Sequence, residues 1–155
     1  MNDRLRLLTE NRPLVLHSTD GQETLGRAAD LFRYIDCNFE RWNCDVAGPP
    51  TQETAVQVYE MVSNSTFQEM FGSFGLPLDS LALTQAQIRQ FAMLYPDWLK
   101  KDGNGTFFLF KVVTEFFVAV TYFFSDGRLG VRVRNLALER VFRAQKRHRL
   151  VRRWW

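Results

Sequence analysis

The chain has 155 residues, of which 46% are hydrophobic and 24% charged, a length that suits one domain with a single hydrophobic core. The high apolar fraction excludes a disordered chain, and the low Gly and Pro content excludes a fibrous one. The formal net charge of +3 hides an asymmetry. Residues 1–127 carry 10 basic and 16 acidic side chains, a net of −6, whereas residues 128–155 carry 10 basic side chains and one acid, a net of +9. We therefore expect a partner to bind the C-terminal end of the chain.

Short apolar runs separated by turns make up the first 50 residues. Residues 14–16 predict a short strand, and residues 31–35 form a second run of moderate strand character. Residues 38–42 predict a turn or a short helix, because two aromatic residues lie three positions apart on one face. The sequence Gly-Pro-Pro at residues 48–50 then breaks the chain.

Three helices are predicted between residues 51 and 100. A short helix is expected over residues 65–71, and a longer one over residues 84–100, where Thr84 and Gln87 form a capping box. The remaining helix would cover residues 51–63, because an N-cap precedes apolar residues with helical spacing. These residues are Thr51 as the N-cap, followed by Val56, Val58, Tyr59 and Val62.

Three consecutive antiparallel strands are predicted over residues 106–112, 116–124 and 128–135. A hairpin at Asp126-Gly127 would join the last two, because this pair favours the positive φ that matches strand twist. Alternation in the third strand would place apolar residues on one face and arginines on the other: Leu129, Val131 and Val133 against Arg128, Arg132 and Arg134. We therefore expect a three-stranded meander with one rim of arginines.

The stretch over residues 106–124 also raises the alternative of a membrane-spanning helix. Its 19 residues carry only two charges, Lys111 and Glu115. However, each charge near the centre of a membrane helix costs about 2.5–3.5 kcal/mol. The stretch is rich in Phe, Val and Thr arranged in two blocks, which favours paired strands, so we expect no membrane span.

Residues 136–155 form a basic C-terminal segment whose secondary structure the sequence leaves open. Periodicity alone favours a helix with one apolar stripe, whereas residues 140–143 and 149–151 could instead form two paired strands. The stripe would contain Ala137, Val141, Ala144, His148, Val151 and Trp155. All these elements together predict one α+β domain over residues 1–155, with helices packed on an antiparallel sheet.

Several motifs carry a resemblance to a known family. They are Asn38-Phe39 with Trp42, Pro50-Thr51, Trp98-Leu99, Asp102-Gly103, residues 106–111 and 116–119, Gly127-Arg128-Leu129 and Val141-Phe142. On these residues the chain resembles an uncharacterised family of small bacterial proteins that is known mostly from genomes of uncultured lineages. The chain departs from it at Thr114-Glu115, where the family has a Gly-Asp-like turn, and at Phe142, where Trp is usual. The resemblance implies a final strand pair, but no activity, cofactor or site.

The basic C-terminal segment carries the strongest functional signal. Guanidinium groups match phosphate geometry and indole rings stack on unpaired bases, so we expect a small non-enzymatic protein that contacts nucleic acid. The expected binding residues are Arg132, Arg134, Arg143, Arg147, Arg149, Arg152, Arg153, Trp154 and Trp155.

Other roles for this segment stay open. In a protein-interaction module, Trp154 and Trp155 would enter a pocket of a partner with an acidic surface, and the arginines would steer association. The segment could also lie on an anionic membrane surface. Without a partner, the arginines would form a solvated face or contact the acidic part of the same chain.

No pattern in the sequence points to catalysis, a metal or a cofactor, and an enzyme is the third and most distant alternative. His17 with Asp20 would supply only half of a metal site, and residues 72–75 lack the Lys of a phosphate-binding loop. Cys37 and Cys44 are expected to be reduced thiols. Because the N-terminal residues contain no apolar signal segment, we expect a cytoplasmic protein.

Overall fold

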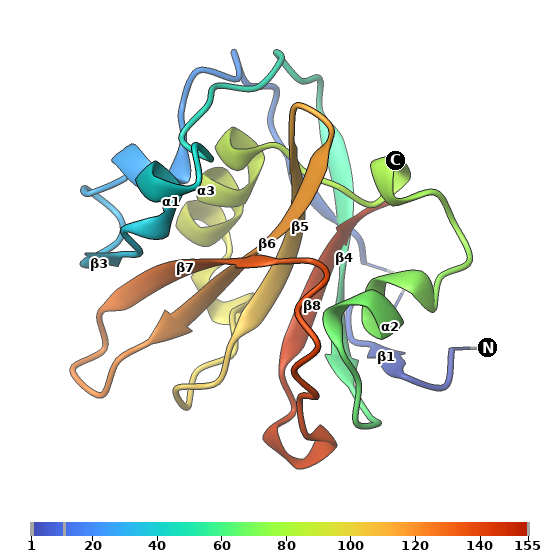
Figure 1. Cartoon of the computed structure of the whole chain (residues 1–155). Coiled ribbons are helices and arrows are strands. Elements are labelled where there is room, and N and C mark those ends of the chain that lie inside the picture. The colour runs from blue at the N-terminus through green and yellow to red at the C-terminus, as the bar shows by residue number, and fades with distance from the viewer. Residues whose placement is uncertain (1, 11, 155) are drawn as a thin grey trace.

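An eight-stranded mixed sheet forms the centre of the molecule (Figure 1). The computed structural model describes residues 2–10 and 12–154. The strand order is β1-β4-β8-β5-β6-β7-β3, and β2 also pairs with β4. The strands are β1 Leu5–Leu7, β2 Leu14–Leu16, β3 Tyr34–Ile35, β4 Thr54–Met61, β5 Thr106–Val112, β6 Glu115–Phe123, β7 Leu129–Asn135 and β8 Arg149–Arg153. The β3–β7 and β5–β8 pairs are parallel. The sheet is therefore mostly antiparallel, whereas the sequence predicted a fully antiparallel one.

Three α-helices cover the two faces of the sheet: α1 Asn38–Arg41, α2 Phe67–Gly72 and α3 Gln85–Leu94. The capping box predicted at Thr84 and Gln87 begins α3, and Thr66 with Glu69 forms another at the start of α2. The predicted helix over residues 84–100 is shorter, because the chain continues after Leu94 as a 3₁₀ turn, Pro96–Trp98. Among the described residues, no helix has the length and apolar character needed to cross a membrane.

The predicted meander is present as β5, β6 and β7. Asp126 and Gly127 form the turn between β6 and β7, and Gly127 adopts a φ of +82°, which explains why glycine is suited to this position. The apolar stretch over residues 106–124 therefore forms two paired strands.

The helix predicted over residues 51–63 is wrong, because this segment contains β4. Its apolar residues face two different cores: Val56 and Val58 pack on one side of the sheet, and Tyr59 and Met61 on the other. Since both faces of β4 are covered, its apolar residues do not alternate with polar ones, and their spacing resembles that of a helix.

The helix favoured for the basic C-terminal segment is also wrong. Phe142 forms an isolated antiparallel bridge with Ser65, Ala144–Lys146 is a short 3₁₀ turn, and β8 follows. β8 does not pair with residues 140–143 but lies between β4 and β5. β8 buries Leu150 in one core and Val151 in the other. This burial is hard to predict from the sequence, because three of the five residues of β8 are arginines.

Two cores rich in phenylalanine lie on opposite faces of the sheet. The core beneath α1 and α3 includes Phe39, Phe91, Phe108 and Phe110. The core beneath α2 includes Phe67, Phe71, Phe107 and Phe142. The second core covers the outer part of β6 and β7 less fully, and Val120 there is accordingly only half-buried.

Candidate functional site

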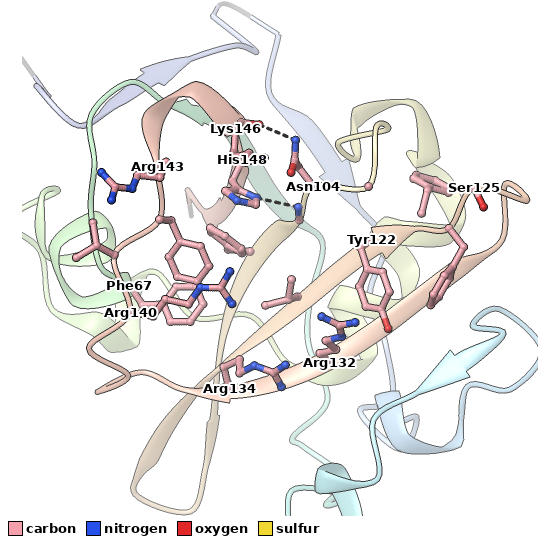
Figure 2. Close-up of a pocket in the computed structure, with 18 residues that line it drawn as sticks. Phe67, Asn104, Tyr122, Ser125, Arg132, Arg134, Arg140, Arg143, Lys146 and His148 are labelled. Carbon is pink, nitrogen blue, oxygen red and sulfur yellow. Dashed lines mark hydrogen bonds between the residues drawn. The ribbon is translucent and has the colours of Figure 1, made fainter.

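A pocket of about 570 Å³ opens over the less covered part of β6 and β7 (Figure 2). We call it the basic pocket. Its cations come from β7 and from the segment between β7 and β8: Arg132, Arg134, Arg140, Arg143 and Lys146. Aromatic side chains form much of the remaining lining: Phe67, Phe107, Tyr122, Phe123, Phe124 and Phe142.

The alternation along β7 directs two arginines into the basic pocket. Val131 and Val133 are fully buried in the core under α1 and α3, so Arg132 and Arg134 project from the other face. In the β6–β7 pairing, Arg132 lies opposite Val120 and Arg134 opposite Val118. The predicted rim of arginines on this strand is therefore confirmed for these two residues.

The chain after β7 folds back over the sheet and supplies the remaining cations. Phe142 holds this segment in place, because its ring packs 4.7 Å from that of Phe67 and 5.0 Å from that of Phe107, centroid to centroid. The guanidinium carbon of Arg140 lies 5.0 Å from the centre of the Phe142 ring. At the next turn, Asn104 Nδ2 donates a hydrogen bond to the carbonyl of Lys146 (3.0 Å).

Positive charge dominates the basic pocket, since none of the described residues that line it is acidic. One of its arginines has a carboxylate partner: Arg134 Nη1 lies 3.1 Å from Asp36 Oδ2. Arg132 instead lies over the Tyr122 ring, with its guanidinium carbon 4.4 Å from the ring centre. In the part of the chain that the structure describes, no carboxylate pairs with the other pocket cations: Arg132, Arg140, Arg143 and Lys146.

His148 lies at the inner wall of the basic pocket. Its Nδ1 accepts a hydrogen bond from the N–H of Gly105 (2.8 Å), so the proton of the neutral ring is on Nε2. Its ring packs against those of Phe107 and Phe142. Burial lowers the pKa of His148, and the nearby charge of Arg140 acts in the same direction. His148 is therefore a neutral donor at pH 7.

The basic pocket brings together only part of the predicted site. Arg132, Arg134 and Arg143 line it, and the exposed Arg147 follows Lys146 at the adjacent turn. Four further lining residues were not among the expected binding residues: Arg140 and Lys146, which belong to the basic segment, and Tyr122 and His148. The sequence carries no signal for Tyr122, because apolar residues fill both faces of β6.

The three arginines of β8 lie elsewhere and make contacts within the chain. Arg149 Nη1 donates to the carbonyl of Trp98 (2.9 Å). Arg152 donates to Gln57 Oε1 and lies over the Phe74 ring, and Arg153 donates to the carbonyls of Ser80 and Asp79. These contacts lie within the chain, but their partners are carbonyls, an amide oxygen and a ring rather than the acidic side chains that the alternative named.

Trp154 does not line the basic pocket. The backbone N–H of Trp154 donates to the carbonyl of Ala55 (2.8 Å), and the residue is 36% exposed. Trp155 lies outside the described residues.

The remaining candidate residues lie apart from the basic pocket. Among the described residues, no three His, Cys, Asp or Glu side chains cluster to hold a metal. Cys37 and Cys44 are free thiols. Burial raises the pKa of Cys44 to about 11, so this thiol stays protonated at pH 7. Residues 72–75 end α2.

Comparisons with protein-family models, with curated proteins and with solved structures find no match to this chain. The function must therefore be argued from the site itself.

Proposed function

We propose that this protein binds nucleic acid, with phosphates held at the basic pocket and at the turn beside it. One observation carries the proposal. Within the described part of the chain, four cations without a carboxylate partner line one concave surface, and the exposed Arg147 follows at the adjacent turn. The four are Arg132, Arg140, Arg143 and Lys146.

Cations without carboxylate partners are suited to binding phosphate for two reasons. Their charge is not cancelled within the protein, so their combined potential attracts a polyanion and displaces its counterions. Guanidinium groups also offer parallel N–H donors that match phosphate oxygens. Arg134 contributes less, because Asp36 neutralises part of its charge.

The arrangement favours a chain of phosphates over a single small anion. Arg132, Arg134 and Arg140 gather at the centre of the basic pocket, whereas Arg143 is directed outward (Figure 2). Arg147 lies outside the pocket lining and is exposed. A ligand that contacts all of these cations must extend beyond the pocket, as a nucleic acid does.

The proposed interface differs from the sequence-based set of residues. It retains Arg132, Arg143 and Arg147, keeps Arg134 with part of its charge neutralised, and adds Arg140 and Lys146. It leaves out the β8 arginines, because each of them donates at least one hydrogen bond within the chain. This arrangement of cations supports nucleic acid as the ligand. An acidic peptide would meet the same cations, so the test includes both ligands.

The test measures fluorescence anisotropy of a labelled mixed-sequence oligonucleotide at about 50 and 200 mM salt. The variant combines Arg140→Gln, Arg143→Gln and Lys146→Gln. Its control combines Arg12→Gln, Arg27→Gln and Arg41→Gln, which remove the same charge from exposed positions outside the basic pocket. Truncation after Asn135 is unsuitable, because it deletes β8 from the middle of the sheet.

We expect the pocket variant to bind at least about tenfold more weakly than the control at the lower salt concentration. Its plot of log affinity against log salt should also be shallower by about 0.7 for each phosphate that the variant no longer neutralises. Equal weakening in both variants would contradict the proposal, because the effect would then be one of net charge. Equally tight binding of a poly-glutamate peptide would identify an acidic protein surface as the ligand instead.

A further inference from the structure

Three aromatic rings, whose planes are inclined to one another, form a partly exposed row beside the basic pocket. The Tyr122 and Phe124 ring centroids lie 5.0 Å apart, and those of Phe124 and Tyr34 lie 4.0 Å apart. Tyr34 is 41% exposed, and the other two residues are half-buried. We call Tyr122, Phe124 and Tyr34 the aromatic shelf.

Gly130 of β7 makes room for the aromatic shelf. It lies opposite Tyr122 in the β6–β7 pair and beside Tyr34 in the β3–β7 pair. A Cβ atom on Gly130 would lie 2.7 Å from Tyr122 Cζ and 2.9 Å from Phe124 Cε2, closer than such atoms approach. The absence of a side chain at this position therefore lets both rings lie across β7.

The aromatic shelf continues directly from the basic pocket. Tyr122 and Phe124 belong to the lining of both, and Arg132 lies over the Tyr122 ring. At the opposite end, the guanidinium carbon of Arg33 lies 5.3 Å from the centre of the Tyr34 ring. A ligand that leaves the basic pocket along this row would meet aromatic rings with a cation at each end.

An acidic peptide would use the cations but has no general need for a row of rings. A nucleic acid duplex would also leave the rings unused, because its bases are stacked on each other inside the double helix. Unpaired bases are flat and apolar, and they stack on aromatic side chains next to cationic grooves that bind the backbone. The combination of ring row and cations thus matches a single strand best.

We propose that the ligand is single-stranded nucleic acid, with bases stacked on the aromatic shelf while the phosphates contact the basic pocket. This inference rests on the proposed function and narrows its substrate class. It assigns a binding role to Tyr34, which lies 98 residues before Arg132 in the sequence.

The experiment compares three labelled probes of equal length at one salt concentration: a single strand, its duplex, and a strand that lacks its bases but retains the phosphates. The variant combines Tyr34→Leu and Phe124→Leu. The control is Trp42→Leu, which removes a ring of similar exposure (42%) that packs on Phe117, away from the shelf. Tyr34→Phe with native Phe124 tests whether a ring alone suffices.

We expect the wild type to bind the single strand about tenfold or more tightly than either other probe. The double variant should bind the single strand roughly five- to hundredfold more weakly, the range expected when base stacking is removed. Its affinity for the base-free strand should not change. The Trp42→Leu control and the Tyr34→Phe variant should bind the single strand as the wild type does.

Equal affinity for the single strand and the base-free strand would overturn the stacking proposal, as would equal weakening of both by the double variant. Salt-dependent binding that depends on Arg140, Arg143 and Lys146 would still support the proposed function in that case. Failure to bind any probe at low salt would contradict the proposed function itself.

Discussion

Asp36 and Arg134 are paired across the edge of the sheet, with Asp36 Oδ2 lying 3.1 Å from Arg134 Nη1. The same oxygen accepts the backbone N–H of Val133 (3.2 Å), and Oδ1 accepts that of Asn38 (3.0 Å). Asp36 therefore links the start of α1 to β7 and neutralises one arginine of the basic pocket. This pairing limits the positive charge available to a ligand.

The substitution Asp36→Asn should release the charge of Arg134 into the basic pocket. We expect oligonucleotide affinity to rise about threefold at low salt and the salt dependence to steepen by up to about 0.7, one additional phosphate neutralised. Without the charge-assisted bonds, the free energy of unfolding should be lower by about 1–2 kcal/mol. Anisotropy titrations and urea denaturation measure the two effects, and unchanged affinity would mean that Arg134 does not reach the ligand.

The substitution Arg153→Met should affect stability without affecting binding. It removes the donors to the Ser80 and Asp79 carbonyls, at a cost of about 1 kcal/mol in the free energy of unfolding. The aliphatic part of the side chain is retained. Because Arg153 lies outside the basic pocket, the oligonucleotide affinity and its salt dependence should match those of the wild type. A shallower salt dependence would place Arg153 in the interface.

Acidification should destabilise the protein through His148 before the carboxylates titrate. Burial lowers the folded-state pKa of His148 below its usual value of 6.5, so below pH 6.5 the unfolded chain binds more protons than the folded one. Its contribution to the free energy of unfolding therefore falls as the pH falls below 6.5.

The substitution His148→Asn offers Oδ1 to the N–H of Gly105 but does not titrate. We expect its free energy of unfolding in urea to change less between pH 7 and pH 5.5 than that of the wild type. Parallel curves for the two proteins would show that His148 is not the group responsible.

The substitution Gly130→Ala should displace the aromatic shelf at little cost in stability. The new methyl group would meet the outer ends of the Tyr122 and Phe124 rings, which are half-exposed and can turn outward. We expect the free energy of unfolding to fall by less than about 1 kcal/mol. The near-UV circular dichroism should change, and single-strand affinity should fall. An unaltered aromatic signal would show that the rings do not depend on Gly130.

Local signals made the helices and the meander predictable. Thr84 with Gln87 defines a helix start within four residues, and Asp126-Gly127 defines a hairpin within two. β4 could not be found in this way, and a strand over residues 149–151 was only one of two alternatives, because the burial of both strands depends on partners far away in the sequence. Val58 of β4, for example, lies opposite Val151 of β8.

The same distinction between local and long-range signals explains why only part of the candidate site could be predicted. The sequence located the excess of positive charge, but it could not show which arginines find partners within the chain. Arg152 lies over the Phe74 ring because β8 enters the sheet next to β4, whereas Arg143 remains exposed on the segment that folds back. The aromatic shelf depends on Tyr34, which only the β3–β7 pairing brings close to Phe124.

The position of β8 also determines when the sheet can be completed during synthesis. Residues 149–153 are synthesised after the other strands of this sheet, yet they join β4 to β5. Until then, a nascent chain has two central strands with unpaired edges, which invite pairing with other chains. We therefore expect the sheet to close slowly and late, because β8 pairs with strands that are far away in the sequence. Until it closes, the nascent chain should need protection against pairing with other chains.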